Sequence, residues 1–202
     1  PAVFIDSTGR SYSLPAHKLP SARGQGEPLS GSLNPPAGAS FAGVMLGEPG
    51  DLYLLATDAG YGFVVKLGDL YANKRAGKGV LKVPKGARVL PPQPVANYKS
   101  DWVCVASNHG RLLSFLVEEL PQLARGKGIK LMNIPSAKAA KREEYVAGLA
   151  VISDGGVLLV YAGRHHLRLK SAQVEQYSGE RGLRGNKLPK GYEHVVRLAG
   201  DK

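Results

Sequence analysis

The chain has 202 residues, of which 43% are hydrophobic, and it carries a formal net charge of +11 at pH 7. Its single cysteine excludes an internal disulfide and indicates a reducing compartment, and no run approaches the roughly 20 apolar residues of a membrane helix. The excess positive charge indicates a surface that binds a polyanion, and a soluble surface that merely happens to be basic is the alternative.

The chain opens directly on strand-forming residues. In the first fifty residues we expect strands at Val3–Ile5, Ser11–Leu14 and Phe41–Leu46, a hairpin turn at Gly9 and a basic glycine loop at Arg23–Gly26. No signal peptide is visible, and the first residue is Pro1 instead of Met. We therefore expect a fragment cut from a longer protein.

The clearest hairpin lies over residues 52–67. Two apolar, β-favouring runs flank its turn, and Gly60 stands where a three-residue hairpin loop needs a left-handed residue. A short helical turn or loop is expected over Gly68–Tyr71, and a basic, glycine-rich loop follows at Asn73–Gly79. Further strands are expected at Val80–Val83 and Arg88–Leu90. Prolines interrupt the second of these, so that any pairing there is at an edge or a bulge.

The second half of the chain follows the same pattern. Strands are expected at Trp102–Ala106, Leu112–Val117, Leu149–Ile152, Val157–Tyr161, Leu167–Leu169 and Tyr192–Leu198. Ser136 could cap a single helical turn within residues 137–144, and a solvated loop is the alternative there. Residues 171–177 are expected to form a link.

A hairpin followed by a basic glycine loop occurs four times. The turn glycines are spaced by 51, 50 and 53 residues, and they are Gly9, Gly60, Gly110 and Gly163. The loops lie at Arg23–Gly26, Arg75–Gly79, Arg125–Gly128 and Arg181–Gly185. Such a period is typical of propeller-like blades, which must stack to cover both faces of their sheets. The sequence therefore predicts one all-β domain over residues 1–202, with repeats at about 1–50, 51–100, 101–156 and 157–202.

The positive charge is uneven along the chain. The four repeats carry net charges of 0, +5, +1 and +5, and within them the basic residues gather in the glycine loops and the preceding hairpin strands. Glycine lets the backbone approach a phosphate closely, while Lys and Arg supply the charge. A loop repeated on every blade suits a long, uniform polyanion. The alternative is that the loops only connect strands, with arginines bonding to nearby carbonyls.

Nothing in the sequence points to catalysis. Gly77-Lys78-Gly79 lacks the Ser or Thr of a phosphate-binding P-loop, the five histidines are not at metal-ligand spacing, and no nucleophile–base set is visible. Cys104 alternates with valines on a strand and is predicted to be buried. We therefore expect no catalytic, cofactor or metal site in this chain.

Most aromatic residues fall on predicted strands. Trp102, Phe63 and Phe115 are predicted to pack in the core, with base stacking as the less favoured interpretation. Tyr61 differs, because it occupies a turn position where two other repeats place Arg. The sequence alone does not decide whether its ring is exposed.

Several longer segments resemble one known family. These are residues 2–13, 20–28, 58–63, 133–137 and 179–182, and they are similar to the C-terminal domain of the bacterial topoisomerase IV A subunit, in the gyrase A C-terminal superfamily. The resemblance covers essentially the whole chain. It implies a β-pinwheel, a propeller-like disc of strand-exchanged blades in an open or closed ring, which contacts DNA on its rim.

The resemblance also implies what this domain does. It would bind double-stranded DNA and position segments for decatenation and relaxation by a bacterial, cytoplasmic, nucleoid-associated enzyme. Its partners would be the topoisomerase IV B subunit and the breakage–reunion region of its own subunit. ATP and Mg would be used by other regions of that enzyme. The alternatives are a gyrase A DNA-wrapping domain and a propeller used for protein contact.

One segment distinguishes the topoisomerase IV role from gyrase-type DNA wrapping. Asn73–Gly79 is a degenerate form of the Gln-Arg-Arg-Gly-Gly-Lys-Gly box that gyrase A subunits need for chiral wrapping. This departure favours decatenation and relaxation over the introduction of negative supercoils. Phosphate contacts would dominate, so that sequence preference should be weak. The residues expected to bind DNA are Lys66, Lys74, Arg75, Lys78, Lys82, Arg111, Arg125, Lys127, Lys130, Arg164, Arg168, Lys170, Arg181, Arg184 and Lys187.

Overall fold

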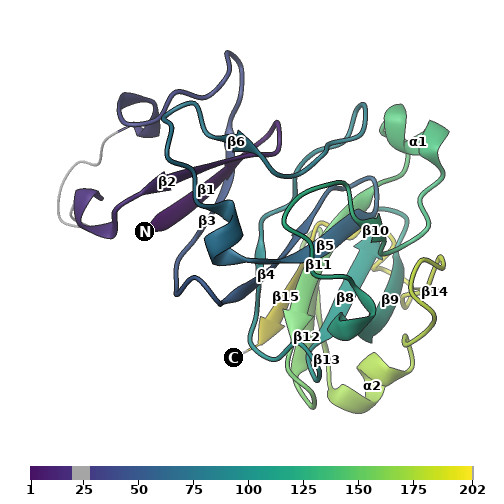
Figure 1. Cartoon of the computed structure of the whole chain (residues 1–202). Helices are drawn as coiled ribbons and strands as arrows, with labels where there is room; N and C mark the ends of the chain where they lie inside the picture. The colour runs from purple at the N-terminus through teal and green to yellow at the C-terminus, as the bar shows by residue number, and fades with distance from the viewer. Residues whose placement is uncertain (20–27, 202) are drawn as a thin grey trace.

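The computed structural model describes residues 1–19 and 28–201, and its regular secondary structure is mainly antiparallel β-sheet, with a few short helices and long connecting loops (Figure 1). The predicted loop at Arg23–Gly26 and most of the segment 20–28 lie outside the described residues. No helix in the described part is long and apolar enough to cross a membrane. The all-β prediction is confirmed.

Two sheets are built around the first two hairpins. The first has the strand order β3-β1-β2-β6 and contains β1 (Ala2–Asp6), β2 (Arg10–Leu14), β3 (Phe41–Met45) and β6 (Lys78–Gly79). The second has the order β10-β5-β4-β7 and contains β4 (Leu52–Ala56), β5 (Tyr61–Lys66), β7 (Gln93–Val95) and β10 (Ile129–Lys130). Because β7 includes Pro94 and lies at a sheet edge, the expected effect of the prolines is confirmed.

Two further sheets follow the same plan. The third has the order β11-β8-β9-β14 and contains β8 (Trp102–Ser107), β9 (Arg111–Leu116), β11 (Val146–Ile152) and β14 (Asn186–Lys187). The fourth has three strands in the order β13-β12-β15, which are β12 (Val157–Ala162), β13 (His165–Leu169) and β15 (Arg197–Asp201). The four predicted turn glycines all have positive φ between the two strands of a hairpin.

The short helices connect these strands. They are the 3₁₀ turns η1 (Ala16–Lys18), η2 (Leu29–Gly31), η3 (Leu67–Leu70) and η4 (Val117–Glu119), and the α-helices α1 (Ser136–Ala140) and α2 (Ser171–Glu175). The helical turn near Ser136 is confirmed. Its predicted cap is not, because Pro135 occupies the N-cap position and no side chain caps the helix.

Four sequence predictions are wrong in detail. No strand forms at Arg88–Leu90, where Val89 makes only an isolated bridge to Thr57, because the residues that pair with β4 are Gln93–Val95. The strand expected at Val80–Val83 is displaced to β6, because the paired residues there are Lys78 and Gly79. The link over 171–177 contains α2. The last strand begins at Arg197 instead of Tyr192, because its pairing with β12 runs from Arg197 to Asp201.

The sheets are completed by exchanged strands. Each of the first three sheets receives its outer two-residue strand from the following repeat: β6 pairs with β2, β10 with β5, and β14 with β9. A glycine directly precedes each paired segment, at Gly77, Gly128 and Gly185. This exchange is the feature that distinguishes a pinwheel from a simple propeller, and it links every sheet to the next.

The exchange depends on close backbone approach. Gly128 has a φ of +83°, and a Cβ atom at this position would lie 2.0 Å from the carbonyl oxygen of Gly62 on the receiving strand. We expect Gly128→Ala to lower the free energy of unfolding by more than about 2 kcal/mol, because the left-handed conformation alone costs roughly 1–2 kcal/mol for an L residue and β10 must also shift. Urea unfolding followed by circular dichroism measures this loss.

Gly79→Ala is the matched control. Gly79 also lies in an exchanged strand, but its φ is not positive and a Cβ atom there would meet nothing within 4 Å. The control should change the free energy of unfolding by less than about 1 kcal/mol. Equal losses in the two variants would mean that the close approach at Gly128 does not stabilise the fold.

Apolar side chains fill the spaces between successive sheets. One cluster joins the first sheet to the second through Ile5 and Phe63, the largest joins the second to the third through Leu54 and Phe115, and another joins the third to the fourth. No such cluster among the described residues joins the first sheet to the fourth. The clusters therefore link the four sheets in chain order, first to second, second to third and third to fourth.

The predicted core aromatics lie in these clusters. Phe63 and Phe115 are buried, and Trp102 is half-buried against the cluster between the third and fourth sheets. Cys104 is fully buried, and this burial raises the pKa of its thiol to about 12. It therefore behaves as the small apolar group that the sequence predicts.

Candidate nucleic-acid interface

The glycine loops of repeats two, three and four lie side by side. The Lys82 amide donates to the Gly126 carbonyl and the Gly126 amide donates to the Val80 carbonyl, both at 2.9 Å. The next loop is joined in the same way, since the Gly182 amide donates to Leu131 and the Asn133 amide to Leu183, both at 3.0 Å. We call residues 73–82, 125–133 and 181–187 together the loop strip.

The loop strip is strongly basic. It contains ten Lys and Arg residues and no Asp or Glu, and the ten are Lys74, Arg75, Lys78, Lys82, Arg125, Lys127, Lys130, Arg181, Arg184 and Lys187. All ten belong to the set that the sequence predicts to bind DNA. The backbone hydrogen bonds between neighbouring loops therefore assemble charges that are more than a hundred residues apart in the sequence.

Three arginines of this region donate hydrogen bonds to backbone carbonyls of neighbouring loops. Arg75 donates to the carbonyls of Gly31 and Ser32 at 3.2 Å, and Arg181 donates to the Lys130 carbonyl at 2.6 Å. Arg111, on β9 beside the strip, donates to the Gly185 carbonyl at 3.0 Å. The alternative weighed from the sequence, in which arginines bond to nearby carbonyls, accounts for the contacts of these three side chains.

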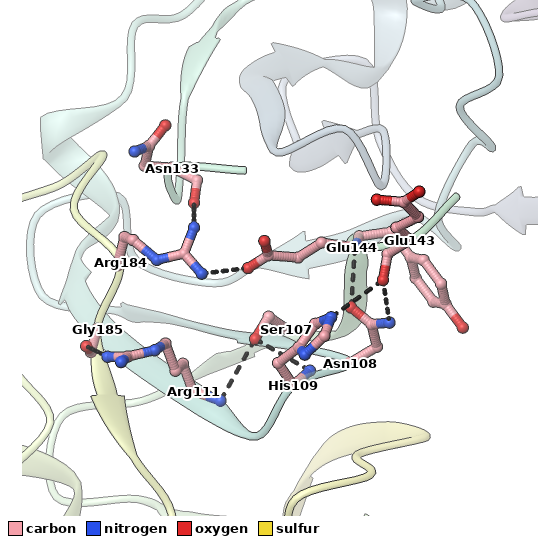
Figure 2. Close-up of polar contacts among 10 residues, drawn as sticks. Ser107, Asn108, His109, Arg111, Asn133, Glu143, Glu144, Arg184 and Gly185 are labelled. Carbon is pink, nitrogen blue, oxygen red and sulfur yellow. Dashed lines mark hydrogen bonds and ion pairs between the residues drawn. The ribbon is translucent and has the colours of Figure 1, made fainter. Parts of the chain in front are cut away.

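Arg184 is anchored by a buried carboxylate. Its Nη2 atom lies 2.5 Å from Oε1 of Glu144, whose side chain is 2% exposed, and its Nη1 atom donates to the Asn133 carbonyl (Figure 2). Figure 2 also shows Arg111 reaching Gly185 from the neighbouring strand. Because a buried carboxylate must be paired, the main role of Arg184 in this structure is to neutralise Glu144.

The lysines of the strip have a different environment. Lys74, Lys78, Lys82, Lys127, Lys130 and Lys187 are all exposed, and so is Arg125. None of them forms an ion pair with a carboxylate of the described residues. Among the described residues, their side chains form one hydrogen bond, from Lys130 to Asn133, and one cation–π contact, of Lys127 with the Tyr61 ring. The positive charge that is free to meet an anion is therefore carried mainly by lysine.

Four residues of the predicted set lie away from the strip. Lys66 is at the far end of β5, five residues and about 17 Å from Tyr61, where β10 pairs. Arg164 is exposed at the turn between β12 and β13, Arg168 on β13 is ion-paired with Asp201, and Lys170 precedes α2. These belong to other parts of the surface.

Sequence reasoning missed one contact of this region. Arg10 donates to the carbonyls of Ala76 and Gly77 at 2.9–3.0 Å, just as Arg111 donates to Gly185. Both arginines directly follow a turn glycine, and each reaches the loop supplied by the next repeat. That shared position is a signal only where the next repeat supplies a loop, because Arg164 also follows a turn glycine and forms no such contact among the described residues.

Comparisons with known proteins agree with this architecture. A family model described as DNA gyrase C-terminal domain, beta-propeller, matches residues 51–95 and 101–153. The A subunit of DNA topoisomerase 4 from Pseudomonas aeruginosa is 56% identical over 99% of this chain, and that from Escherichia coli K12 is 43% identical over 100% of it. The chain spans 26% of the length of each of these curated relatives.

Solved structures match as well. The structure of the E. coli ParC C-terminal domain superimposes with a TM-score of 0.89 at 42% identity, covering 100% of this chain and 81% of that one. A DNA gyrase A C-terminal domain superimposes with a TM-score of 0.73 at 14% identity, covering 100% of this chain and 65% of that one. At that identity the second match shows a shared fold alone.

Proposed function

Since this chain belongs to the family of C-terminal domains of the bacterial topoisomerase IV A subunit, in the gyrase A C-terminal superfamily, we propose that it binds duplex DNA non-specifically along the loop strip. The observation that carries this proposal is the set of exposed basic side chains on three joined loops that contain no Asp or Glu. Such a surface suits phosphates, which repeat along any duplex.

The proposal extends to the longer protein. The domain would position DNA segments for decatenation and relaxation by an ATP-dependent type II topoisomerase in the bacterial cytoplasm. Its partners would be the topoisomerase IV B subunit and the breakage–reunion region of its own subunit. Catalysis, ATP and Mg would belong to those other regions, and this domain would act through binding alone. The degenerate segment Asn73–Gly79 favours this role over gyrase-type wrapping.

The test is duplex binding by the chain itself. Fluorescence anisotropy with two unrelated labelled duplexes, measured at several salt concentrations, should give similar affinities for both. The logarithm of the binding constant should fall linearly with the logarithm of the salt concentration, by about 0.9 for each phosphate contact. Absence of binding at low salt, or binding that does not respond to salt, would contradict the proposal.

A protein-contact function is the second candidate. Val44 and Leu46, at the end of β3, are 53% and 54% exposed, and adjacent exposed apolar side chains are typical of contact surfaces. This candidate predicts that Val44→Ser and Leu46→Ser together weaken binding to the remainder of the longer protein and leave DNA binding by the domain unchanged. Loss of DNA binding in that variant would count against the separation of the two surfaces.

A further inference from the structure

A pocket of about 230 Å³ opens between the second hairpin and the loops that follow it. Three lysines, Lys82, Lys85 and Lys127, line it together with the ring of Tyr61. Its apolar side includes Ile134 and Ala139, which are both buried. The lining therefore combines an apolar wall, an aromatic ring and a concentrated positive charge.

The charge in this pocket is not neutralised by the protein. No Asp or Glu lines the pocket, and none of the three lysines forms an ion pair within the described part of the chain. Lys127 lies over the Tyr61 ring, with its Nζ atom 4.3 Å from the ring centroid. An anion is the natural partner for ammonium groups arranged in this way.

Tyr61 lines this pocket at a position where two other hairpins have an arginine. In the first and third hairpins the residue after the turn glycine is Arg10 or Arg111, and its guanidinium donates to carbonyls of the loop supplied by the next repeat. Tyr61 has the corresponding position in the second hairpin, where it pairs with Lys130, but its side chain forms no such hydrogen bond among the described residues. Its ring lines an open space, whereas the two arginines reach across to the loop.

We propose that this pocket binds an aromatic anion of mononucleotide size, such as a nucleoside monophosphate or an unpaired nucleotide at the end of a DNA strand. The phosphate contacts the lysines, while the base lies against Tyr61 and the apolar wall. A base that is paired inside a duplex cannot enter, since its faces are covered by its neighbours. The inference therefore goes beyond non-specific duplex binding and does not depend on it.

The probe is deoxyadenosine monophosphate, titrated into the protein by isothermal calorimetry. Adenosine and inorganic phosphate, which each carry half of the recognised chemistry, should bind roughly tenfold or more weakly, because stacking and charge each contribute. In separate samples, a duplex with a single-nucleotide overhang is compared with a blunt duplex of the same sequence. Tighter binding of the overhang identifies a strand end as a source of the ligand, and equal binding identifies the free nucleotide.

Tyr61→Arg is the main variant. Because arginine occupies the corresponding position in two other hairpins, the fold should be preserved, and the guanidinium should reach the loop carbonyls and fill the pocket. Affinity for the nucleotide should fall by roughly tenfold or more. Replacing Lys82 and Lys85 together by Gln should cause a similar loss through the phosphate. Lys99→Ala removes one exposed charge outside both the pocket and the strip, and it should cause none.

The nucleotide and overhang titrations can each contradict the proposed pocket. The inference is overturned if neither the nucleotide nor the overhang is bound, if inorganic phosphate binds as tightly as the nucleotide, or if both pocket variants bind normally. Blunt-duplex affinity is measured for the same proteins, so the two proposals fail separately. Duplex binding without nucleotide binding removes only the pocket, and nucleotide binding without duplex binding removes only the proposed function.

Discussion

Replacing Lys78, Arg125 and Lys187 together by alanine is expected to flatten the log–log salt dependence of duplex binding by up to about 2.7. Each residue comes from a different loop of the strip, is exposed, and forms no ion pair within the described residues. Each lost phosphate contact removes the release of about 0.9 counterions. When the salt concentration is lowered from 1 M to 0.1 M, the affinity of the unmodified protein therefore rises about 500-fold more than that of the variant. Anisotropy titrations of the two proteins give the slopes directly.

The control removes the same charge from elsewhere. Lys99, Lys138 and Lys141 are exposed and lie outside the loop strip. Arg142, which is close to two of them in the sequence, is unsuitable because its Nη2 atom lies 2.8 Å from Oδ2 of buried Asp58. The hydrogen bond with Asp58 raises the pKa of Arg142, and its removal would disturb the fold as well as the charge.

Comparing the strip variant with the control variant shows whether DNA binding depends on where the positive charges lie or only on the net charge. If the strip variant loses salt dependence and the control does not, the placement of the charges matters. Equal losses in the two variants would mean that only net charge governs binding, and the loop-strip proposal would fail. If both variants retain the original slope and affinity, the basic loops are connectors, and protein contact becomes the better function for this domain.

Phe115→Ala is expected to lower the free energy of unfolding by about 3–5 kcal/mol. The ring is 1% exposed and lies in the cluster between the second and third sheets. Its removal costs the transfer free energy of the ring and leaves a cavity that the surrounding strands fill only in part. Since domains are stable by about 5–15 kcal/mol, this is a large share of the total. Urea unfolding monitored by circular dichroism measures the change.

Two further variants keep the Phe115 prediction testable. If Phe115→Ala does not fold, Phe115→Leu leaves a smaller cavity and should give a measurable loss of about 1 kcal/mol. Val196→Ala is the control, because Val196 is 61% exposed and its truncation should change the free energy of unfolding by less than about 0.5 kcal/mol. A loss below about 1 kcal/mol in Phe115→Ala would show that this cluster does not hold the two sheets together.

Local sequence patterns were sufficient for the hairpins. The glycines at positions 9, 60, 110 and 163 mark four turns because only a left-handed residue closes such loops without strain, and the alternating or continuous apolar runs beside them supply the strands. The repeat follows from these turns alone. Burial of Phe63, Phe115 and Cys104 also follows, since each lies in an apolar run on a strand of a hairpin and such residues are most often buried.

The exchanged strands were beyond the reach of local patterns. β6, β10 and β14 are each two residues long, which is too short for a hydrophobic period, and their partners belong to the preceding repeat. The misplaced strand at Val80–Val83 has this cause, because the apolar run lies beside the paired residues. β15 was placed too early for a related reason, since only its pairing with β12 defines where it begins.

The sequence by itself determined the fold class, the repeat and the excess of positive charge. Only the tertiary structure decided what each charge does, because that depends on which groups lie within reach. Arg181 and Arg184 meet a carbonyl and a buried carboxylate, while Lys78 and Lys187 meet no carboxylate in the described chain. The tertiary structure also decided that Tyr61 lines a pocket, whereas Arg10 and Arg111, at the corresponding positions of two other hairpins, bond to loop carbonyls. Contacts between residues fifty or more positions apart arise from the stacking of sheets, which no local pattern encodes.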